Sequence, residues 1–131
     1  MNRHVLHVID LYSRFPENWD GEHAHAIGEQ VKHNLLDFLV RATPAFCAAL
    51  HDYDVVPMPN GTITLELGNG QRYFVVDMGR TSVLTYYRVE QVVEGHTEAV
   101  PYTAQTAAEV VAASMALFAR YEQALLAASP K

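Results

Sequence analysis

The sequence has only one cysteine, Cys47, among its 131 residues. A single cysteine excludes an internal disulfide, and such sparse use of cysteine is typical of a reducing compartment. We therefore expect a cytoplasmic protein. Cys47 itself lies in an alanine-rich stretch with no basic neighbour, which favours a small buried side chain over a reactive nucleophile.

Positive charge is also scarce, because nine Lys and Arg residues face fifteen Asp and Glu residues, giving a net charge of −6. A basic surface supplies most of the affinity for nucleic acid or for anionic membranes. We therefore expect no direct nucleic-acid partner and no membrane partner. No apolar run approaches the roughly 20 residues of a membrane span. The first twelve residues, with one aspartate and two histidines, do not resemble a signal peptide.

Several catalytic motifs are missing from the sequence. It contains no G-x-S-x-G nucleophile elbow, no glycine-rich phosphate loop, and no H-E-x-x-H or C-x-x-C metal motif. From these absences we predict no catalytic residue, no cofactor and no enzymatic activity.

What is present favours a folded protein, since half of the residues are hydrophobic and 18% are charged. The length suits a single domain over residues 1–131. We predict an α+β fold with three parts. These are a helical part over about residues 1–52, a three- to four-stranded antiparallel meander over about 54–100, and a C-terminal helix over about 104–128 that packs on one sheet face.

Apolar residues at helical spacing predict the first helices. One helix ends near Arg14, and a second runs from about His23 to Arg41. Thr43-Pro44 is typical of a helix start, because threonine caps the free N–H groups and proline suits the first turn. A short third helix is therefore expected over about residues 45–51. Thr106 and Glu109 match a capping box at the start of the last helix.

Strict alternation of polar and apolar residues predicts a strand over Thr62–Leu67. The Asn69-Gly70 pair that follows is typical of a two-residue hairpin turn. In that register Leu65 lies opposite Phe74. One face of this hairpin is then apolar and forms the core face, which consists of Ile63, Leu65, Leu67, Phe74, Val76 and Met78.

A second turn is predicted at Gly79-Arg80, but the strand after it is ambiguous. A two-residue turn buries alternate residues beginning with Val83, namely Val83, Thr85, Tyr87 and Val89. A longer turn or a bulge buries Leu84 and Tyr86 instead. The pattern alone leaves both arrangements open.

Two regions are candidate partner-binding sites. Trp19 and Asp20 lie in a predicted loop, where an exposed tryptophan would be a binding anchor. The favoured alternative is that Trp19 covers the core and Asp20 fixes the turn. The second region is the outer sheet face, where Tyr73 is predicted opposite Tyr86 and Val75 opposite Leu84. That patch of Tyr73, Val75, Leu84 and Tyr86 requires either a covering helix or a partner.

The histidines suggest a metal site as an alternative. His23 and His25 directly follow Asp20 and Glu22, and two imidazoles with a carboxylate can hold a divalent metal. Exposed or capping histidines are the favoured interpretation. The alternative functions are thus a metal-binding protein or metal-dependent enzyme using these four residues, and a small-molecule-binding domain with a tyrosine-lined pocket.

Two segments resemble motifs of a group of small bacterial and phage proteins. Asn18–Ala24 resembles their N-W-D-G-x-x-A signature, and Pro57–Leu67 resembles their P-x-P-[DN]-G-x-[IV]-x-L-E segment. The resemblance covers about residues 18–90. These proteins are largely uncharacterised and occur on phages and other mobile elements, sometimes near toxin–antitoxin or defence genes. The resemblance implies a protein-binding role and no catalytic residue.

Together these features predict a small protein-interaction module, such as an antitoxin, an immunity protein or an anti-defence inhibitor from a mobile element. An acidic protein of this kind suits a basic partner, which it attracts by electrostatic steering. The chain is also predicted to form a homodimer, through the tyrosine-rich outer sheet face or through the alanine-rich last helix.

Overall fold

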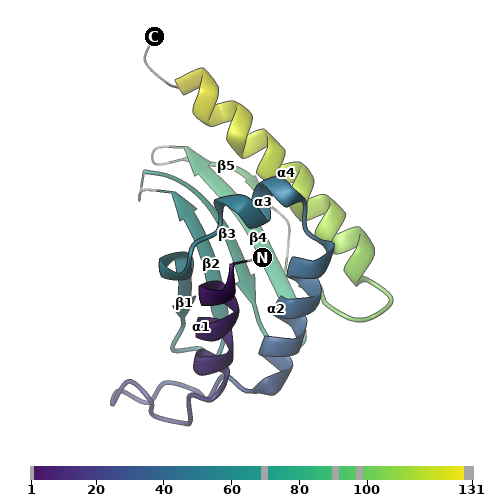
Figure 1. Cartoon of the computed structure of the whole chain (residues 1–131). Coiled ribbons are helices and arrows are strands. Elements are labelled where there is room, and N and C mark those ends of the chain that lie inside the picture. Colours follow the sequence, from purple (N-terminus) through teal and green to yellow (C-terminus); the bar gives the residue numbers. More distant parts are fainter. Residues whose placement is uncertain (1, 69–70, 90–91, 97–98, 129–131) are drawn as a thin grey trace.

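The fold consists of helices on one side of an antiparallel sheet (Figure 1). It was obtained as a computed structural model and describes residues 2–68, 71–89, 92–96 and 99–128. The α+β prediction is confirmed. The elements are α1 (Arg3–Ser13), α2 (Glu29–Arg41), α3 (Pro44–Ala49), the 3-10 helix η1 (Asp52–Asp54), β1 (Val55–Pro57), β2 (Ile63–Gly68), β3 (Arg72–Met78), β4 (Ser82–Val89), β5 (Val92–His96), β6 (Val100–Pro101) and α4 (Ala107–Ala128).

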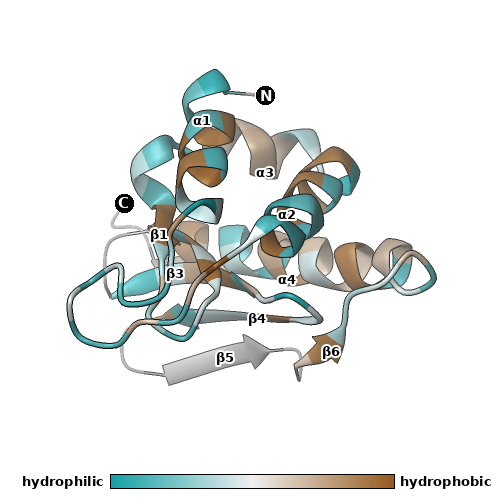
Figure 2. Cartoon of the chain, turned by 90° about the horizontal axis from the view of Figure 1, so that it is seen from below, coloured by the Kyte–Doolittle hydropathy of each residue, from teal (hydrophilic) through white to brown (hydrophobic). Residues whose placement is uncertain are grey.

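The sheet has the strand order β1-β2-β3-β4-β5, and the short strand β6 also pairs with β4. All these pairs are antiparallel. The sheet is therefore larger than the three- to four-stranded meander predicted above. The strands beyond that number, β5 and β6, follow β4 near the end of the predicted sheet region over about residues 54–100. Figure 2 shows the helices gathered on one side of the sheet.

The register between β2 and β3 differs from the prediction by two residues. Leu65 lies opposite Val76, not Phe74, and Gly68 lies opposite Tyr73. Because side chains alternate between faces with a period of two, a shift of two leaves every side chain on its predicted face. The predicted core face is therefore correct although the pairing was wrong. The predicted turn residues Asn69 and Gly70 lie outside the described residues.

Gly68 explains where the hairpin departs from a simple two-residue turn. Its φ is +123°, and a Cβ at this position would lie 2.0 Å from the carbonyl oxygen of Arg72. Only glycine combines this backbone conformation with such a close approach. The positive φ is thus found at Gly68, one residue before the predicted Asn69-Gly70 turn.

The turn between β3 and β4 resolves the ambiguity in β4. The Gly79 N–H donates to the Ser82 carbonyl at 2.9 Å, so the two-residue turn is Arg80-Thr81, one residue later than predicted. This turn places Val83 and its alternate neighbours on the helix side, as in the first of the two arrangements. The buried residues of β4 are Val83, Thr85 and Tyr87.

The same turn is fixed by α2. The Asn34 side chain, which is 5% exposed, donates from Nδ2 to the carbonyls of Gly79 at 3.0 Å and Arg80 at 3.1 Å. The Asn34 Oδ1 in turn accepts a hydrogen bond from Gln30. The buried Asn34 amide therefore has its hydrogen-bond acceptors in the same turn that it holds in place.

The helices agree with the prediction except at one boundary. Helix α1 is capped by Asn2, whose Oδ1 accepts from the His4 N–H at 2.8 Å. Helix α3 is capped by Thr43, as predicted. Helix α2, however, begins at Glu29 and not near His23. The six residues before Glu29 belong to a loop whose backbone N–H groups bind side chains and other backbone groups, as described below.

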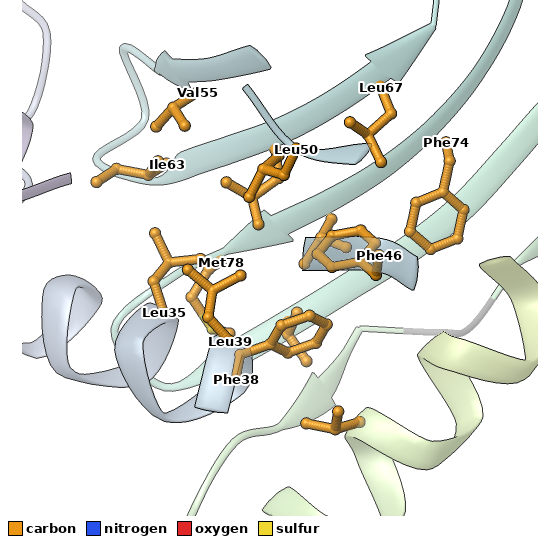
Figure 3. Close-up of a cluster of buried hydrophobic side chains, with 14 of the residues drawn as sticks. Leu35, Phe38, Leu39, Phe46, Leu50, Val55, Ile63, Leu67, Phe74 and Met78 are labelled. Atoms are coloured by element: carbon orange, nitrogen blue, oxygen red, sulfur yellow. The ribbon is translucent and has the colours of Figure 1, made fainter. Parts of the chain in front are cut away.

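An aromatic cluster lies at the centre of the core (Figure 3). Phe46, from the short helix α3, has its ring centroid 5.2 Å from that of Phe118, 5.9 Å from Phe74 and 6.1 Å from Phe38. These rings come from α4, β3 and α2. Phe46 therefore links α2 and α4 to the sheet, and edge-on aromatic pairs of this kind are favourable beyond their apolar area.

Helix α4 crosses the sheet with its buried side on β3 and β4. Its buried residues include Val111, Ser114 and Phe118. By length and composition alone, Ala107–Ala127 reaches the range of a membrane-crossing helix, with a mean hydropathy of 1.2. The expectation that no apolar run approaches that length is therefore corrected. About 33% of the most apolar stretch of α4 is buried inside the fold, where the helix contacts β3 and β4.

Candidate functional site

Trp19 is half-buried in the loop between α1 and α2. Its indole Nε1 donates to the His25 carbonyl at 2.9 Å, and its ring centroid lies 5.1 Å from that of Phe15. The indole is therefore held from two sides. This position lies between the two alternatives drawn from the sequence, since Trp19 covers neighbouring loop residues and keeps part of its surface exposed.

Asp20 and Asn18 organise the backbone of the same loop. Asp20 Oδ1 accepts hydrogen bonds from the N–H groups of Glu22 at 2.8 Å and Ala24 at 3.0 Å. These bonds, with that from Glu22 the stronger, lower the pKa of Asp20. Asn18 Oδ1 accepts from the His23 N–H at 2.8 Å. The side chains of the N-W-D-G segment thus serve the conformation of their own loop.

The two motif segments identified in the sequence lie against each other. The His25 N–H donates to the Pro59 carbonyl at 2.7 Å. At Gly61, whose φ is +91°, a Cβ would lie 3.0 Å from the Ala26 carbonyl oxygen. The loop that follows N-W-D-G therefore docks on the β1–β2 turn, and glycine at position 61 permits that approach.

The proposed metal ligands do not converge. Glu22, His23 and His25 are all exposed, and His25 Nδ1 lies 3.7 Å from Glu17 Oε2. Asp20 is occupied by backbone N–H groups. Within the ranges that the structure describes, no three His, Cys, Asp or Glu side chains are grouped to hold a metal ion.

The outer-face patch, defined above as Tyr73, Val75, Leu84 and Tyr86, lies on the sheet face opposite the core face. The observed pairing places Val75 opposite Tyr86, not Leu84, and Tyr73 opposite Arg88, not Tyr86. Val75 is only 3% exposed, whereas the other three patch residues are half-buried.

Charged groups border the outer-face patch. The Arg88 guanidinium lies over the Tyr73 ring, 4.7 Å from its centroid. Glu66, which pairs with Val75 on the same face, is exposed, and Asp77 accepts a hydrogen bond from Thr64 at 3.3 Å. Burial raises the pKa of the Tyr86 hydroxyl above its ordinary value. The patch therefore has an apolar and aromatic centre with carboxylates beside it.

A polar hollow of about 340 Å³ lies between α2 and the segment before α4. The Tyr102 hydroxyl donates to Asp37 Oδ2 at 2.7 Å, and Arg41 Nε donates to the same oxygen at 3.0 Å. Burial and this hydrogen bond raise the pKa of Tyr102 well above its ordinary range. Because these groups satisfy one another, the arrangement fixes the chain segment that leads into α4.

A second pocket, of about 260 Å³, is formed by η1, the end of β2 and the C-terminal half of α4. The sequence did not reveal it, because its walls come from three separate segments. We call it the η1–α4 pocket. Its lining residues are Ala49, His51, Tyr53, Asp54, Leu67, Gly68, Phe118, Tyr121, Glu122 and Leu125.

Asp54 is the most buried acid in the η1–α4 pocket, with 7% of its surface exposed. Its Oδ2 accepts a hydrogen bond from the His51 N–H at 2.8 Å. Burial raises the pKa of Asp54, although the hydrogen bond from His51 opposes this effect. Tyr121 donates its hydroxyl to the Arg72 carbonyl at 3.2 Å.

The rim of the η1–α4 pocket carries an exposed aromatic ring. Tyr53 is 76% exposed, and its ring stacks on that of His51 with centroids 5.1 Å apart and planes at 12°. An exposed tyrosine beside a concave, partly apolar pocket is typical of a recognition surface. The tyrosine-lined small-molecule pocket expected from the sequence remains a prediction.

Cys47 is partly buried, with its Sγ 3.5 Å from the Leu39 carbonyl oxygen. Burial raises the pKa of this thiol. Because the thiolate is the reactive form, a raised pKa agrees with the structural role inferred from the sequence.

Comparison of this chain with protein-family models, with curated proteins and with solved structures finds no match.

Proposed function

We propose that the chain is a small protein-interaction module that binds a basic partner protein through the outer-face patch. The observation that carries this proposal is the one-sided arrangement of the fold. The helices gather on the core face (Figure 2), while Tyr73, Leu84 and Tyr86 remain half-exposed on the other face. Tyrosines that are half-exposed around a buried aliphatic centre are typical of interface cores.

Charge supports the choice of a basic partner. The chain carries a net charge of −6, and Glu66 lies beside the patch on the same face. Because the Arg88 cation is placed over Tyr73, the carboxylates are the charges left for a partner. Complementary charge of this kind raises the association rate and selects against acidic partners. A second copy of the chain would bring the same negative charge to the interface.

This role fits an inhibitor class that works by occupying another protein, such as an antitoxin, an immunity protein or an anti-defence inhibitor encoded on a mobile element. It requires no cofactor and no catalytic group. The partner of such an inhibitor in the cytoplasm is commonly a nucleic-acid-processing protein, whose basic surface would complement the acidic chain. The resemblance of the N-W-D-G segment to phage and mobile-element proteins supports the same class.

Affinity capture from the native host, with quantitative mass spectrometry, tests the proposal. The bait proteins are the wild type, Tyr86→Glu in the patch, and Val40→Glu as a matched control at an apolar position that is 84% exposed on α2. We expect a stoichiometric basic protein with the wild type and with Val40→Glu, and its loss with Tyr86→Glu. Thermal melts establish that all three variants are folded.

Sedimentation equilibrium of the same proteins tests whether the chain forms the predicted homodimer. A dimer that Tyr86→Glu dissociates would assign the patch to a second copy and contradict the basic hetero-partner. A monomer that captures no stoichiometric protein would overturn the proposed function. An acidic partner, or one captured equally by Tyr86→Glu, would contradict the role of the patch.

A further inference from the structure

The η1–α4 pocket lies on the helix side of the sheet, at the end of β2 where Gly68 pairs with Tyr73. It therefore shares one end of the sheet with the outer-face patch, although the two lie on opposite faces. A partner that covers this end can contact Tyr73 on one side and Tyr53 on the other. The pocket is thus placed to be a second contact of the same complex.

The charge of the pocket is one-sided. Its lining residues include two acids, Asp54 and Glu122, and no lysine or arginine. Asp54 is 7% exposed, and its Oδ2 accepts a hydrogen bond from the His51 N–H at 2.8 Å. Burial of this carboxylate is unfavourable for its charged form, as the raised pKa of Asp54 indicates. A cation that enters the pocket would offset this cost.

The other walls suit the stem of a basic side chain. Leu67, Phe118 and Leu125 are apolar, and Tyr53 and Tyr121 add aromatic side chains to the lining. The volume of about 260 Å³ is smaller than the roughly 300–1,000 Å³ of drug-sized ligand pockets, and it is sufficient for one long side chain. A lysine or arginine combines an apolar stem with a charged end in this way.

We infer that the η1–α4 pocket binds a lysine or arginine side chain of the partner protein, with Asp54 and Glu122 facing the cation and the apolar wall holding the stem. This inference rests on the proposed function and adds the chemistry of one contact. Tyr53 at the rim then covers the inserted side chain and excludes water around the charge.

Titration with small blocked amino acids, followed by amide shifts in NMR spectra, tests the inference without a partner. The probes are Nα-acetyl-lysine-N-methylamide, the arginine counterpart, and Nα-acetyl-norleucine-N-methylamide, which has a similar stem without the charge. We expect the basic probes to shift the amides of Ala49, Gly68 and Leu125, and the norleucine probe to bind at least tenfold more weakly.

Two variants assign the binding to the pocket acid. Asp54→Asn removes the charge and keeps an oxygen for the His51 N–H, so it should lower basic-probe affinity at least tenfold. Asp52→Asn removes the same charge at an exposed position outside the pocket lining and should change the affinity less than twofold. Equal binding of norleucine, or unchanged binding by folded Asp54→Asn, would overturn the inference.

The titration tests the pocket inference and the capture experiment tests the proposed function, so either can fail without the other. If the basic probes bind and no partner is captured, the pocket assignment stands and the proposed function falls. If a basic partner is captured through Tyr86 while the probes do not bind, the proposed function stands and the pocket inference is wrong.

Discussion

The hydroxyl groups of Thr85 and Ser114 lie 2.9 Å apart at fully buried positions, where they join β4 to α4. Both residues are 0% exposed. Only one of the two arrangements left open for β4 placed Thr85 on the core face. The structure brings these two polar positions together, so that each hydroxyl has a partner in a layer that is otherwise apolar.

This relationship predicts a coupled effect on stability. Ser114→Ala leaves the Thr85 hydroxyl with one partner fewer, and we expect the free energy of unfolding to fall by about 1–3 kcal/mol. Thr85→Val combined with Ser114→Ala should cost less than the sum of the single changes, with a coupling of about 0.5–3 kcal/mol. Urea denaturation of the four proteins of this cycle measures the coupling. Additive single effects would contradict the pairing.

The backbone conformation and close contacts of Gly68 predict that any other residue at this position is destabilising. Gly68→Ala should lower the free energy of unfolding by at least about 1–3 kcal/mol, because a positive φ is combined with a Cβ 2.0 Å from a backbone oxygen. Gly21→Ala is the matched control, since Gly21 also has a positive φ, +75°, but no atom within 4 Å of the added Cβ. The denaturation midpoint of Gly68→Ala should lie clearly below that of Gly21→Ala, and the reverse order would disprove the close approach.

Asp54 predicts a distinctive pH dependence. Its pKa is raised in the folded state by burial, so the folded protein binds the proton more tightly than the unfolded chain does. Its contribution to stability is therefore fully present below the ordinary pKa of 3.8 and is lost as the pH rises through the raised value.

Asp54→Asn should thus be at least as stable as the wild type at neutral pH and should flatten the acid side of the stability profile. Asp52→Asn, at the exposed neighbour, should change that profile less, because the charge of Asp52 is the smallest of the causes that act on the pKa of Asp54. Thermal melts between mildly acidic and neutral pH provide the measurement. A lower melting temperature of Asp54→Asn at neutral pH would show that the carboxylate stabilises the fold.

The lowered pKa of Asp20 predicts a pH dependence of stability opposite in sign to that of Asp54. The pKa of Asp20 is lowered by the hydrogen bonds from Glu22 and Ala24, so its stabilising effect is present above the ordinary pKa of 3.8 and is lost as the pH falls through the lowered value. Asp20→Ala should speed amide hydrogen exchange at Glu22 and Ala24, while Asp20→Asn, which keeps an acceptor oxygen, should have a smaller effect. Equal exchange rates in both variants would contradict the role of the Oδ1 acceptor.

The arrangement of the residues around His23 and His25 leads to a prediction about bound metal. The untagged protein should carry no stoichiometric zinc or nickel when measured by plasma mass spectrometry, because the described side chains around His23 and His25 form no three-ligand group. A one-to-one metal content that His23→Ala with His25→Ala abolishes would reinstate the metal-binding alternative.

The fold class could be predicted from local patterns, but the exact pairing could not. Alternation predicted which side of β2 and β3 faces the core. This prediction remained correct despite a register shift of two at Leu65, because the period is two. The predicted pairing was wrong because Gly68, whose φ is +123°, belongs to β2 and lies opposite Tyr73. The start of α2 was misplaced because the hydrogen bonds of Asn18 and Asp20 outweigh the helical spacing of residues 23–28.

For the candidate sites too, some features could be predicted from local sequence patterns and others could not. Tyr73 could be assigned to the outer face from alternation, whereas Tyr86 could not, because the pattern left two arrangements of β4 open. The η1–α4 pocket could not be found, because Asp54 and Glu122 are far apart in the sequence and no local pattern links them. That Val75 is buried while its neighbours are half-exposed likewise depends on cross-strand packing, which the sequence of a single strand does not encode.

The position of Trp19 separates two optical signals. It is the only tryptophan, and its indole is bound to the His25 carbonyl in the loop and not among the rings around Phe46. Tryptophan emission and its quenching by acrylamide therefore follow the opening of this loop, whereas the near-ultraviolet circular dichroism of the buried phenylalanine and tyrosine rings follows the core. Opening of the loop and loss of the core can be recorded in one sample without an added dye or label.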